Sequence, residues 1–129
     1  MDKHTVPPAP NPDSLASMVE TFKALAEPTR ARLVLFLVGG ERSVNDLVHA
    51  LGVHQSTVSR HLAVLRAADL VTTRREGARI HYRLASSHVG DLAVQAYSHA
   101  EHERLELPDH PGPEANEAYQ RPAVVESRH

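Results

Sequence analysis

Three histidines lie on one side of a predicted helix in the last third of the chain. The helix covers about residues 87–104, with Ser86 or Ser87 as its N-cap. At 3.6 residues per turn, His88, His99 and His102 fall within a wedge of about 60°. Imidazole nitrogens are frequent ligands of zinc, cobalt and nickel, so this spacing predicts a metal site.

A single helix cannot bring all three imidazoles to one ion. His99 and His102 are one turn apart, whereas His88 precedes His99 by eleven residues, or about 16 Å along the helix axis. An antiparallel copy of the helix from a second subunit would place His88 of one chain near the other two histidines of its partner. The spacing therefore predicts a homodimer with two equivalent intersubunit metal sites.

The number of ligands bears on the identity of the metal. Three histidines and one carboxylate would form a tetrahedral zinc site. Further donors would raise the coordination to five or six, which favours nickel or cobalt over zinc. Four side chains nearby or near the chain ends could supply such donors: Glu101, Glu103, His110 and His4.

A second stretch with functional side chains is VHQSTVSRHLAVLRAADL, residues 53–70. Its apolar residues Val58, Leu62 and Leu65 recur at helical spacing and predict a helix over about 54–68. The other side carries hydroxyl, amide and basic groups, which form hydrogen bonds with base edges and phosphates. The predicted DNA contacts on this helix are Gln55, Ser56, Thr57, Ser59, Arg60 and His61.

The segments on either side of this helix complete a DNA-binding pattern. Upstream, Ser43 and Asp46 form an approximate capping box for a helix that stops at Gly52, which predicts a helix-turn-helix. Downstream, two β-prone runs flank Gly77 and predict a hairpin. Its basic tip would contact phosphates or an adjacent minor groove, as a wing. The predicted phosphate contacts are Arg60, Arg74, Arg75 and Arg79.

The remaining chain divides into an arm, a folded domain and a tail. Residues 1–13 contain four prolines and are predicted to be a disordered arm. The folded domain, 14–107, begins with a helix over about 14–26 with Ser14 as its N-cap, and a central helix follows from Pro28 to Val38. Residues 108–129 are spaced by prolines and predict a flexible tail. The first helix carries one apolar stripe, made of Leu15, Met18, Val19, Phe22 and Leu25.

Composition restricts the class of protein. The net charge of −2 combines a basic middle, with six arginines and two acids over 54–83, and an acidic end, with seven acids and three arginines over 101–129. Such a basic segment is typical of a nucleic-acid partner. The absence of cysteine excludes thiolate sites and disulfides,. No signal peptide or membrane-spanning run is present, which predicts a cytoplasmic protein without membrane contact.

Two alternatives come from other functional classes. A winged-helix regulator that ignores metals would keep the DNA-binding residues, but it leaves the histidine spacing unexplained. A hydrolase with a histidine-built metal centre would need a substrate cleft and a general base beside the metal. No nucleophile motif occurs in the chain, so an enzyme is not expected.

About residues 14–107 resemble the ArsR/SmtB family of metal-responsive repressors. The similar segments are LAEPTRARLVLFL, SVNDLVHALGVHQSTVSRHLAVLRAADLV, GARIHYRL and the histidine-bearing helix. The resemblance implies a mainly α fold with a small β-hairpin, a winged helix-turn-helix that is homodimeric through its first and last helices. It also implies that the dimer binds double-stranded operator DNA and leaves it when metal binds.

The resemblance extends to one of the two metal sites of that family. The cysteine site is absent, because the matching segment reads ERSVNDL. The last-helix pattern Asp-x-His-x10-His-x2-His is present with Ser86 in place of the aspartate. The helix looks most like those of the nickel/cobalt sensors of the NmtR and KmtR type, which implies Ni(II) or Co(II), with Zn(II) as the alternative. By that resemblance His110 and then Glu101 are the added ligands.

Overall fold

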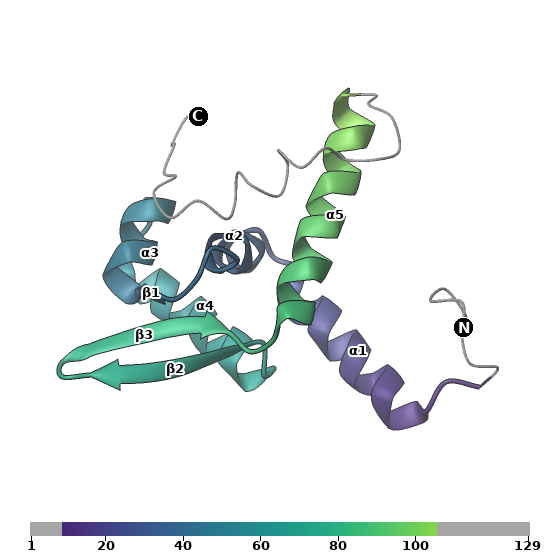
Figure 1. The fold of residues 1–129 in the computed structure, drawn as a ribbon, viewed down its shortest axis with the longest axis horizontal. Helices are drawn as coiled ribbons and strands as arrows, with labels where there is room; N and C mark the ends of the chain where they lie inside the picture. Colours follow the sequence, from purple (N-terminus) through teal and green to yellow (C-terminus); the bar gives the residue numbers. More distant parts are fainter. Residues whose placement is uncertain (1–8, 106–129) are drawn as a thin grey trace.

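The structure, a computed structural model, describes residues 9–105. The mainly α fold with a small β-hairpin that the sequence predicts is confirmed (Figure 1). Its elements in chain order are α1 (Pro12–Leu25), α2 (Pro28–Leu37), β1 (Arg42–Ser43), α3 (Val44–Leu51), α4 (Gln55–Ala67), β2 (Val71–Glu76), β3 (Arg79–Leu84) and α5 (Ser87–Leu105).

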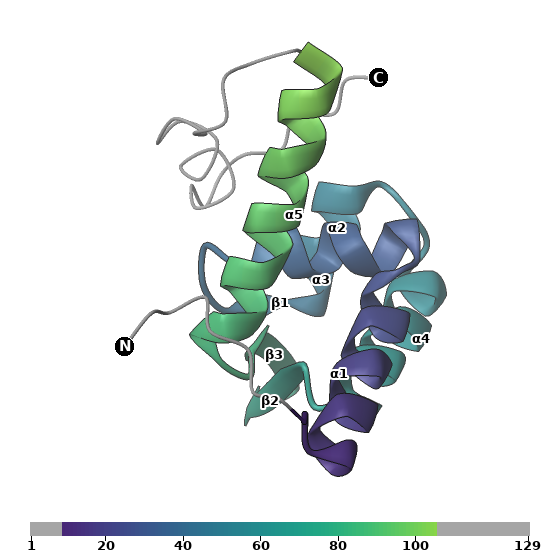
Figure 2. The same ribbon diagram turned by 90° about the vertical axis from the view of Figure 1, so that its right-hand side faces the viewer.

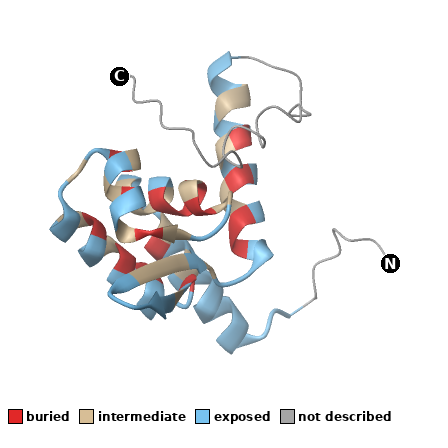
Figure 3. Ribbon diagram, turned by 60° about the vertical axis from the view of Figure 1, so that its left-hand side comes forward, coloured by how far each residue is buried: buried red, intermediate tan, exposed pale blue. Residues whose placement is uncertain are grey.

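Helix α2 forms the centre of the core, as its nearly continuous apolar sequence predicts. Leu33 and Val34 are fully buried and Leu37 is nearly so. The helix contacts α1, α3, α4 and α5, so few of its side chains reach solvent. Figure 3 shows the buried residues on the sides of the helices that face this centre. Because α2 is covered by its neighbours, its position fixes where α4 and α5 lie.

The α3–turn–α4 unit forms where the caps and the apolar spacing predict it. The backbone N–H of Asp46 donates to Ser43 Oγ at 3.1 Å, and the Ser43 N–H donates back to Asp46 Oδ2 at 3.2 Å. This capping box begins α3. Gly52, at φ 69°, ends it in the left-handed region,. On α4 the apolar stripe is fully buried, so the polar side of α4 faces outward.

The hairpin belongs to a three-stranded antiparallel sheet in the order β1-β3-β2. Val71 pairs with Leu84 at its base and Glu76 with Arg79 at its tip. The loop contains only Gly77, at φ 62°, and Ala78. Strand β1 could not be predicted from the sequence, because a two-residue strand shows no alternating pattern,.

The predicted start of the first helix is wrong. Helix α1 begins at Pro12, and its N-cap is Asn11 rather than Ser14. The Asn11 side chain accepts hydrogen bonds from the backbone N–H groups of Asp13 and Ser14, at 2.9 and 3.0 Å. Proline suits the first helical position because its φ is already helical and its missing N–H is not needed there. The rest of the predicted arm, residues 1–8, and the predicted tail, 108–129, lie outside the described residues.

The predicted apolar stripe of α1 is present but faces solvent. Met18 and Phe22 are 49% and 48% exposed, and α1 is mostly pale blue in Figure 3. No helix within residues 9–105 is long and apolar enough to cross a membrane. Helix α1 lies on the same side of the molecule as α5, and Figure 2 shows both toward the viewer. The two helices thus present a surface that the rest of the described chain leaves open.

Candidate nucleic-acid surface and metal ligands

The outward side of α4 carries unpaired polar groups in its first two turns. Gln55, Ser56, Ser59 and Arg60 are exposed, and Thr57 is half-buried. Among residues 9–105 none of the four exposed side chains has a hydrogen-bond or ion-pair partner. Donors and acceptors without a partner on one side of a helix are available to base edges and phosphates.

His61 lies apart from this group, although its position in the sequence predicts a DNA contact. Only 13% of its side chain is exposed. Its Nδ1 is 3.3 Å from Nη1 of Arg30 and 3.7 Å from Oε1 of Glu27. On α4 it neighbours the buried stripe of Val58 and Leu65, which turns the imidazole toward α2. His61 therefore joins α4 to the start of α2 and contributes little to the exposed side of α4.

Glu27 and Arg30 organise this junction of α1, α2 and α4. The Glu27 carboxylate caps α2 by accepting the Arg30 backbone N–H at 2.9 Å. This hydrogen bond, together with the nearby charges of His61 and Arg30, lowers the pKa of Glu27. Arg30 Nε in turn donates to the carbonyl oxygen of Ala24 at 2.6 Å, near the end of α1. The same few side chains thus link three helices.

The three predicted phosphate contacts of the hairpin differ in their surroundings. Arg75 and Arg79 are exposed and have no ion-pair partner among the described residues. The Arg74 guanidinium instead forms an ion pair with Glu41, with Nη2 and Oε1 2.7 Å apart. Side-chain hydrogen bonding within the pair raises the pKa of Arg74 and lowers the pKa of Glu41. Glu41 was missed from the sequence because it lies 33 residues from Arg74.

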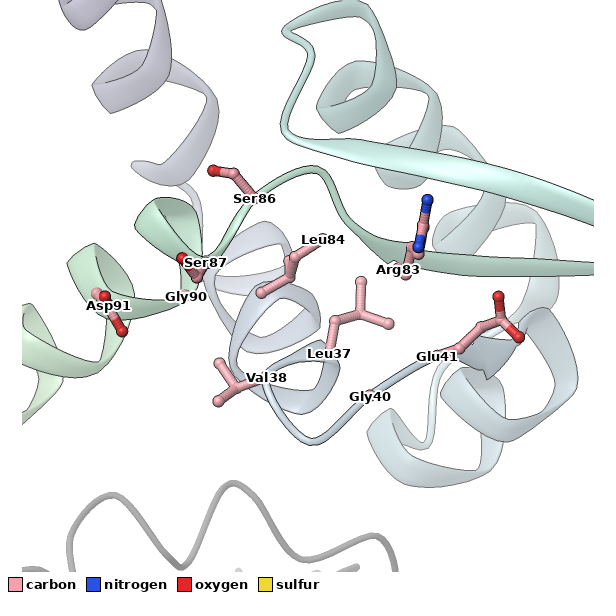
Figure 4. A pocket seen from close by; sticks show the side chains of 10 residues that line it. All are labelled: Leu37, Val38, Gly40, Glu41, Arg83, Leu84, Ser86, Ser87, Gly90 and Asp91. Atoms are coloured by element: carbon pink, nitrogen blue, oxygen red, sulfur yellow. The ribbon is translucent and has the colours of Figure 1, made fainter.

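A cavity of about 600 Å³ separates the base of the hairpin from the start of α5. Figure 4 shows Glu41 and Arg83 at one end of it and Ser87 and Asp91 at the other. Beside it, a Cβ on Gly90 would come within 3.1 Å of Cδ1 of Leu84, tighter than ordinary van der Waals contact. Glycine at this position therefore lets the histidine-bearing helix approach β3 closely.

The three histidines of α5 lie where the spacing predicts, on the side of the helix that α2 does not cover. His88 and His99 are exposed, and His102 is half-buried. His102 Nε2 is enclosed and has no hydrogen-bond partner among the described residues. A buried ring nitrogen without a partner is rare in folded proteins. This donor set fits a metal ion, because imidazole suits nickel, cobalt and zinc alike.

Two further residues, Glu101 and His110, are predicted metal ligands. Glu101 accepts hydrogen bonds from Tyr97 Oη and Arg104 Nη2, both at 2.9 Å. These bonds lower the pKa of Glu101, and the bond from Arg104 has the larger effect. Both oxygens of Glu101 are thus engaged, so it must release at least one partner to bind a metal. His110 lies outside the described residues.

Within one chain the candidate ligands do not gather around a point. No three histidine, aspartate or glutamate side chains in residues 9–105 are close enough to hold one ion. His99 Nε2 has a single carboxylate near it, at 3.8 Å, from Glu103. The separation of His88 from His99 along a continuous helix accounts for this arrangement,. A site that includes all three histidines needs ligands from more than one chain.

Comparison with known proteins identifies the family. The family described as "Bacterial regulatory protein, arsR family" matches residues 27–73. The chain is 43% identical over 104 residues to the HTH-type transcriptional regulator KmtR of Mycobacterium tuberculosis, with 80% of each chain covered. It is 41% identical over 107 residues to NmtR of the same organism, covering 81% of this chain and 89% of NmtR. The chain belongs to the arsR family.

Solved structures show the same fold. A homodimeric winged helix-turn-helix DNA-binding domain from Mycobacterium bovis matches with a TM-score of 0.68 and 29% identity, covering 81% of this chain and 99% of that domain. The repressor BigR from Xylella fastidiosa matches with a TM-score of 0.62 and 36% identity, covering 66% and 87%. The arsR-family protein described here is thus a winged helix-turn-helix protein. Its family and fold are those of transcriptional regulators and not of enzymes.

Proposed function

We propose that this arsR-family protein is a metal-responsive repressor. Its dimer binds operator DNA and is released when Ni(II) or Co(II) binds between the last helices of the two subunits. The observation that carries the proposal is the placement of His88, His99 and His102 on one side of α5, with His102 Nε2 lacking a hydrogen-bond partner among residues 9–105. A relative supports the assignment as a repressor, because SmtB of Mycobacterium tuberculosis is described as a transcriptional repressor.

The DNA-binding part rests on α4 and the hairpin. In a two-fold dimer the two recognition helices enter successive major grooves about 34–36 Å apart, which matches an inverted repeat. Gln55, Ser56, Thr57 and Ser59 would contact base edges. Arg60, with Arg75 and Arg79 of the hairpin, would contact phosphates, and each such contact steepens the salt dependence of binding.

The dimer rests on the open apolar surface of α1 and α5. An apolar cavity of about 430 Å³ lies between these helices and α2, lined in part by Phe22, Leu35, Leu92 and Tyr97. The exposed stripe of α1 continues from it. Burying such a surface against a second copy removes apolar area from water and stabilises association. The homodimeric state of the Mycobacterium bovis domain supports the same assembly.

The metal would be held by His88 of one subunit with His99 and His102 of the partner, and again by symmetry. Glu101 and His110 are the proposed added ligands. A bound ion would link the two α5 helices and so favour one arrangement of the two subunits. That arrangement would no longer match the spacing of the grooves. Since coupling between two ligands is reciprocal, operator DNA must weaken metal binding by the same factor.

The test is fluorescence anisotropy of the full chain on DNA from upstream of its own gene, titrated separately with nickel, cobalt and zinc. Release by nickel and cobalt at lower concentrations than zinc is the expected result. Release by zinc alone would favour four ligands on the helix pair and overturn the nickel/cobalt assignment. No release by any metal would leave a DNA-binding regulator that does not respond to metal.

A matched pair of variants tests the ligands themselves. His99→Ala removes a proposed ligand, whereas Gln95→Ala changes an exposed residue on the same side of α5. We expect His99→Ala to bind operator DNA without releasing it on nickel addition, and Gln95→Ala to behave as the wild type. A His99→Ala protein that still leaves DNA at the same nickel concentration would contradict the site.

A further inference from the structure

Arg74 is held by two carboxylates on the outer surface of the sheet. Its Nε donates to Glu41 Oε1 and Oε2 at 3.2 and 3.1 Å, and its Nη2 donates to Oε1 at 2.7 Å. Nη2 also lies 3.6 Å from Oε1 of Glu76, and that oxygen is 3.2 Å from His81 Nε2. The Nε and Nη2 edge of the guanidinium is thus occupied by carboxylate oxygens.

The ion pair joins strands that are not neighbours in the sheet. Glu41 immediately precedes β1, Arg74 is on β2, and β3 lies between these strands. His81 of β3 pairs with Ser43 on one side and with Arg74 on the other. The Glu41–Arg74 contact therefore crosses the central strand and ties the α2–β1 segment to the far edge of the sheet.

Arg74, one end of this contact, lies at the level where the sheet loses its third strand. The Ser43–His81 pair is the last pair of β1, and toward the tip only β2 and β3 continue. An isolated two-stranded hairpin is only marginally stable in water. The part of the hairpin that carries Arg75 and Arg79 is of this kind. A bidentate guanidinium–carboxylate pair restricts orientation more than a single contact does, so it can hold the hairpin at its last supported level.

From this placement, and on the basis of the proposed DNA-binding function, we infer that Arg74 is a positioning residue. Its pair with Glu41 orients the hairpin relative to α3 and α4, while Arg75 and Arg79 make the phosphate contacts. Glu41 is well placed for this role, because Ser43, which caps α3, is only two residues further along the chain. The Glu41–Arg74 pair therefore transmits the position of the helix-turn-helix to the basic tip.

Glu41→Gln tests the inference through the sign of its effect. The substitution removes a negative charge near the DNA, so simple electrostatics predicts tighter binding. If the pair positions the hairpin, operator binding weakens instead, by about 2- to 5-fold, the range that an exposed ion pair contributes. Tighter binding by Glu41→Gln, measured by anisotropy, would overturn the inference.

Salt dependence separates the arginines. Arg75→Gln and Arg79→Gln should each reduce the slope of log K against log salt by about one, as expected for a lost phosphate contact. Arg74→Gln should weaken binding with the slope unchanged, and the Glu41→Gln/Arg74→Gln double variant should bind no worse than either single variant. A slope reduced by about one in Arg74→Gln would show a phosphate contact and contradict a positioning role.

A measurement without DNA keeps this inference separate from the proposed function. Failure of the wild-type chain to bind its upstream DNA would contradict the proposed function alone. The NMR order parameters of the backbone amides of Gly77 and Ala78, measured by nitrogen relaxation, still report on the rigidity of the hairpin. We expect them to fall in Glu41→Gln and to stay at the wild-type values in Arg75→Gln. Unchanged order in both variants would overturn the inference.

Discussion

Two regions of the molecule differ in how far their apolar residues are buried. One is the segment from α3 to β3, here called the recognition unit, and the other is the pair of helices α1 and α5. On α4 the stripe of Val58, Leu62 and Leu65 is fully buried by the same chain. On α1 the stripe that includes Met18 and Phe22 is about half exposed. The first region completes its core within one chain, whereas the second leaves a surface of the kind that a second subunit covers.

The polar groups of the two regions differ in the same way. In the recognition unit Arg74 is paired with the nearby Glu41, whereas Arg75 and Arg79 at the tip have no partner within residues 9–105. Helix α5 places its histidines on an open side where one chain does not bring three ligands together within the described residues. The contrast fits the proposed function, in which the DNA contacts lie within one subunit and the metal ligands come from both.

The largest effect is expected from placing a charge on the open surface. Phe22→Asp should raise the dissociation constant of the proposed dimer by at least about 100-fold, because each side chain loses about 1.5–3 kcal/mol of burial and a two-fold dimer contains two copies. Sedimentation analysis measures the effect, with circular dichroism to confirm folding. Ser17→Asp, on the opposite side of α1, is the matched control. A dimer unaffected by Phe22→Asp would place the interface elsewhere.

The core of the recognition unit should be sensitive to loss of volume. Leu62→Ala removes a fully buried side chain and should lower the free energy of unfolding by about 2–5 kcal/mol. Urea denaturation measures this loss. Ala63→Ser, at the exposed neighbouring position, should stay within about 0.5 kcal/mol of the wild type. A small effect of Leu62→Ala would mean that the monomer core does not stabilise the chain by itself.

A smaller effect is expected at the start of α3. Ser43→Ala removes the hydroxyl that accepts the backbone N–H of Asp46 in the capping box. The substitution should lower the free energy of unfolding by about 1 kcal/mol. Asn45→Ala, exposed in the first turn of the same helix, serves as the control and should not destabilise the chain. Equal stability of Ser43→Ala and the wild type would show that the capping box is dispensable in the folded domain.

The smallest expected effect is a loss of folding stability in the two regions at acid pH. The folded structure lowers the pKa of Glu27, at the α2–α4 junction, and of Glu101, on α5. A carboxyl group whose pKa is lowered by folding stabilises the fold fully above its unfolded pKa, and this contribution is lost as the pH falls through the folded pKa. Stability should therefore decline as the pH drops below about 4.5, near the ordinary value of the carboxyl group.

Single variants assign the acid sensitivity to a region. In urea unfolding between neutral and acid pH, Glu27→Gln should flatten the decline, because the Glu27 carboxylate both caps α2 and contacts His61 on α4. Glu101→Gln should flatten it less, since its partners Tyr97 and Arg104 are on the same helix. A larger change in Glu101→Gln than in Glu27→Gln would reverse this order.

Local signals in the sequence determined the helices, the turn and the hairpin. The capping box at Ser43 and the apolar spacing of α4 act over a few residues, and the structure confirms both. Gly77 at the hairpin loop is a signal of the same range. The start of α1 was missed because Ser14 and Asn11 are both good N-cap residues. Pro12 favours Asn11 as the cap, since proline is suited to the first helical position.

Contacts between distant segments were decided by the tertiary structure alone. His61 reads as part of a polar helix side, but α2 supplies the partners that turn it inward. Arg74 reads as one of three equivalent cations, but a carboxylate 33 residues away separates it from Arg75 and Arg79. Residue type and periodicity describe one segment at a time, whereas the pairing of a charge depends on which segments folding brings together.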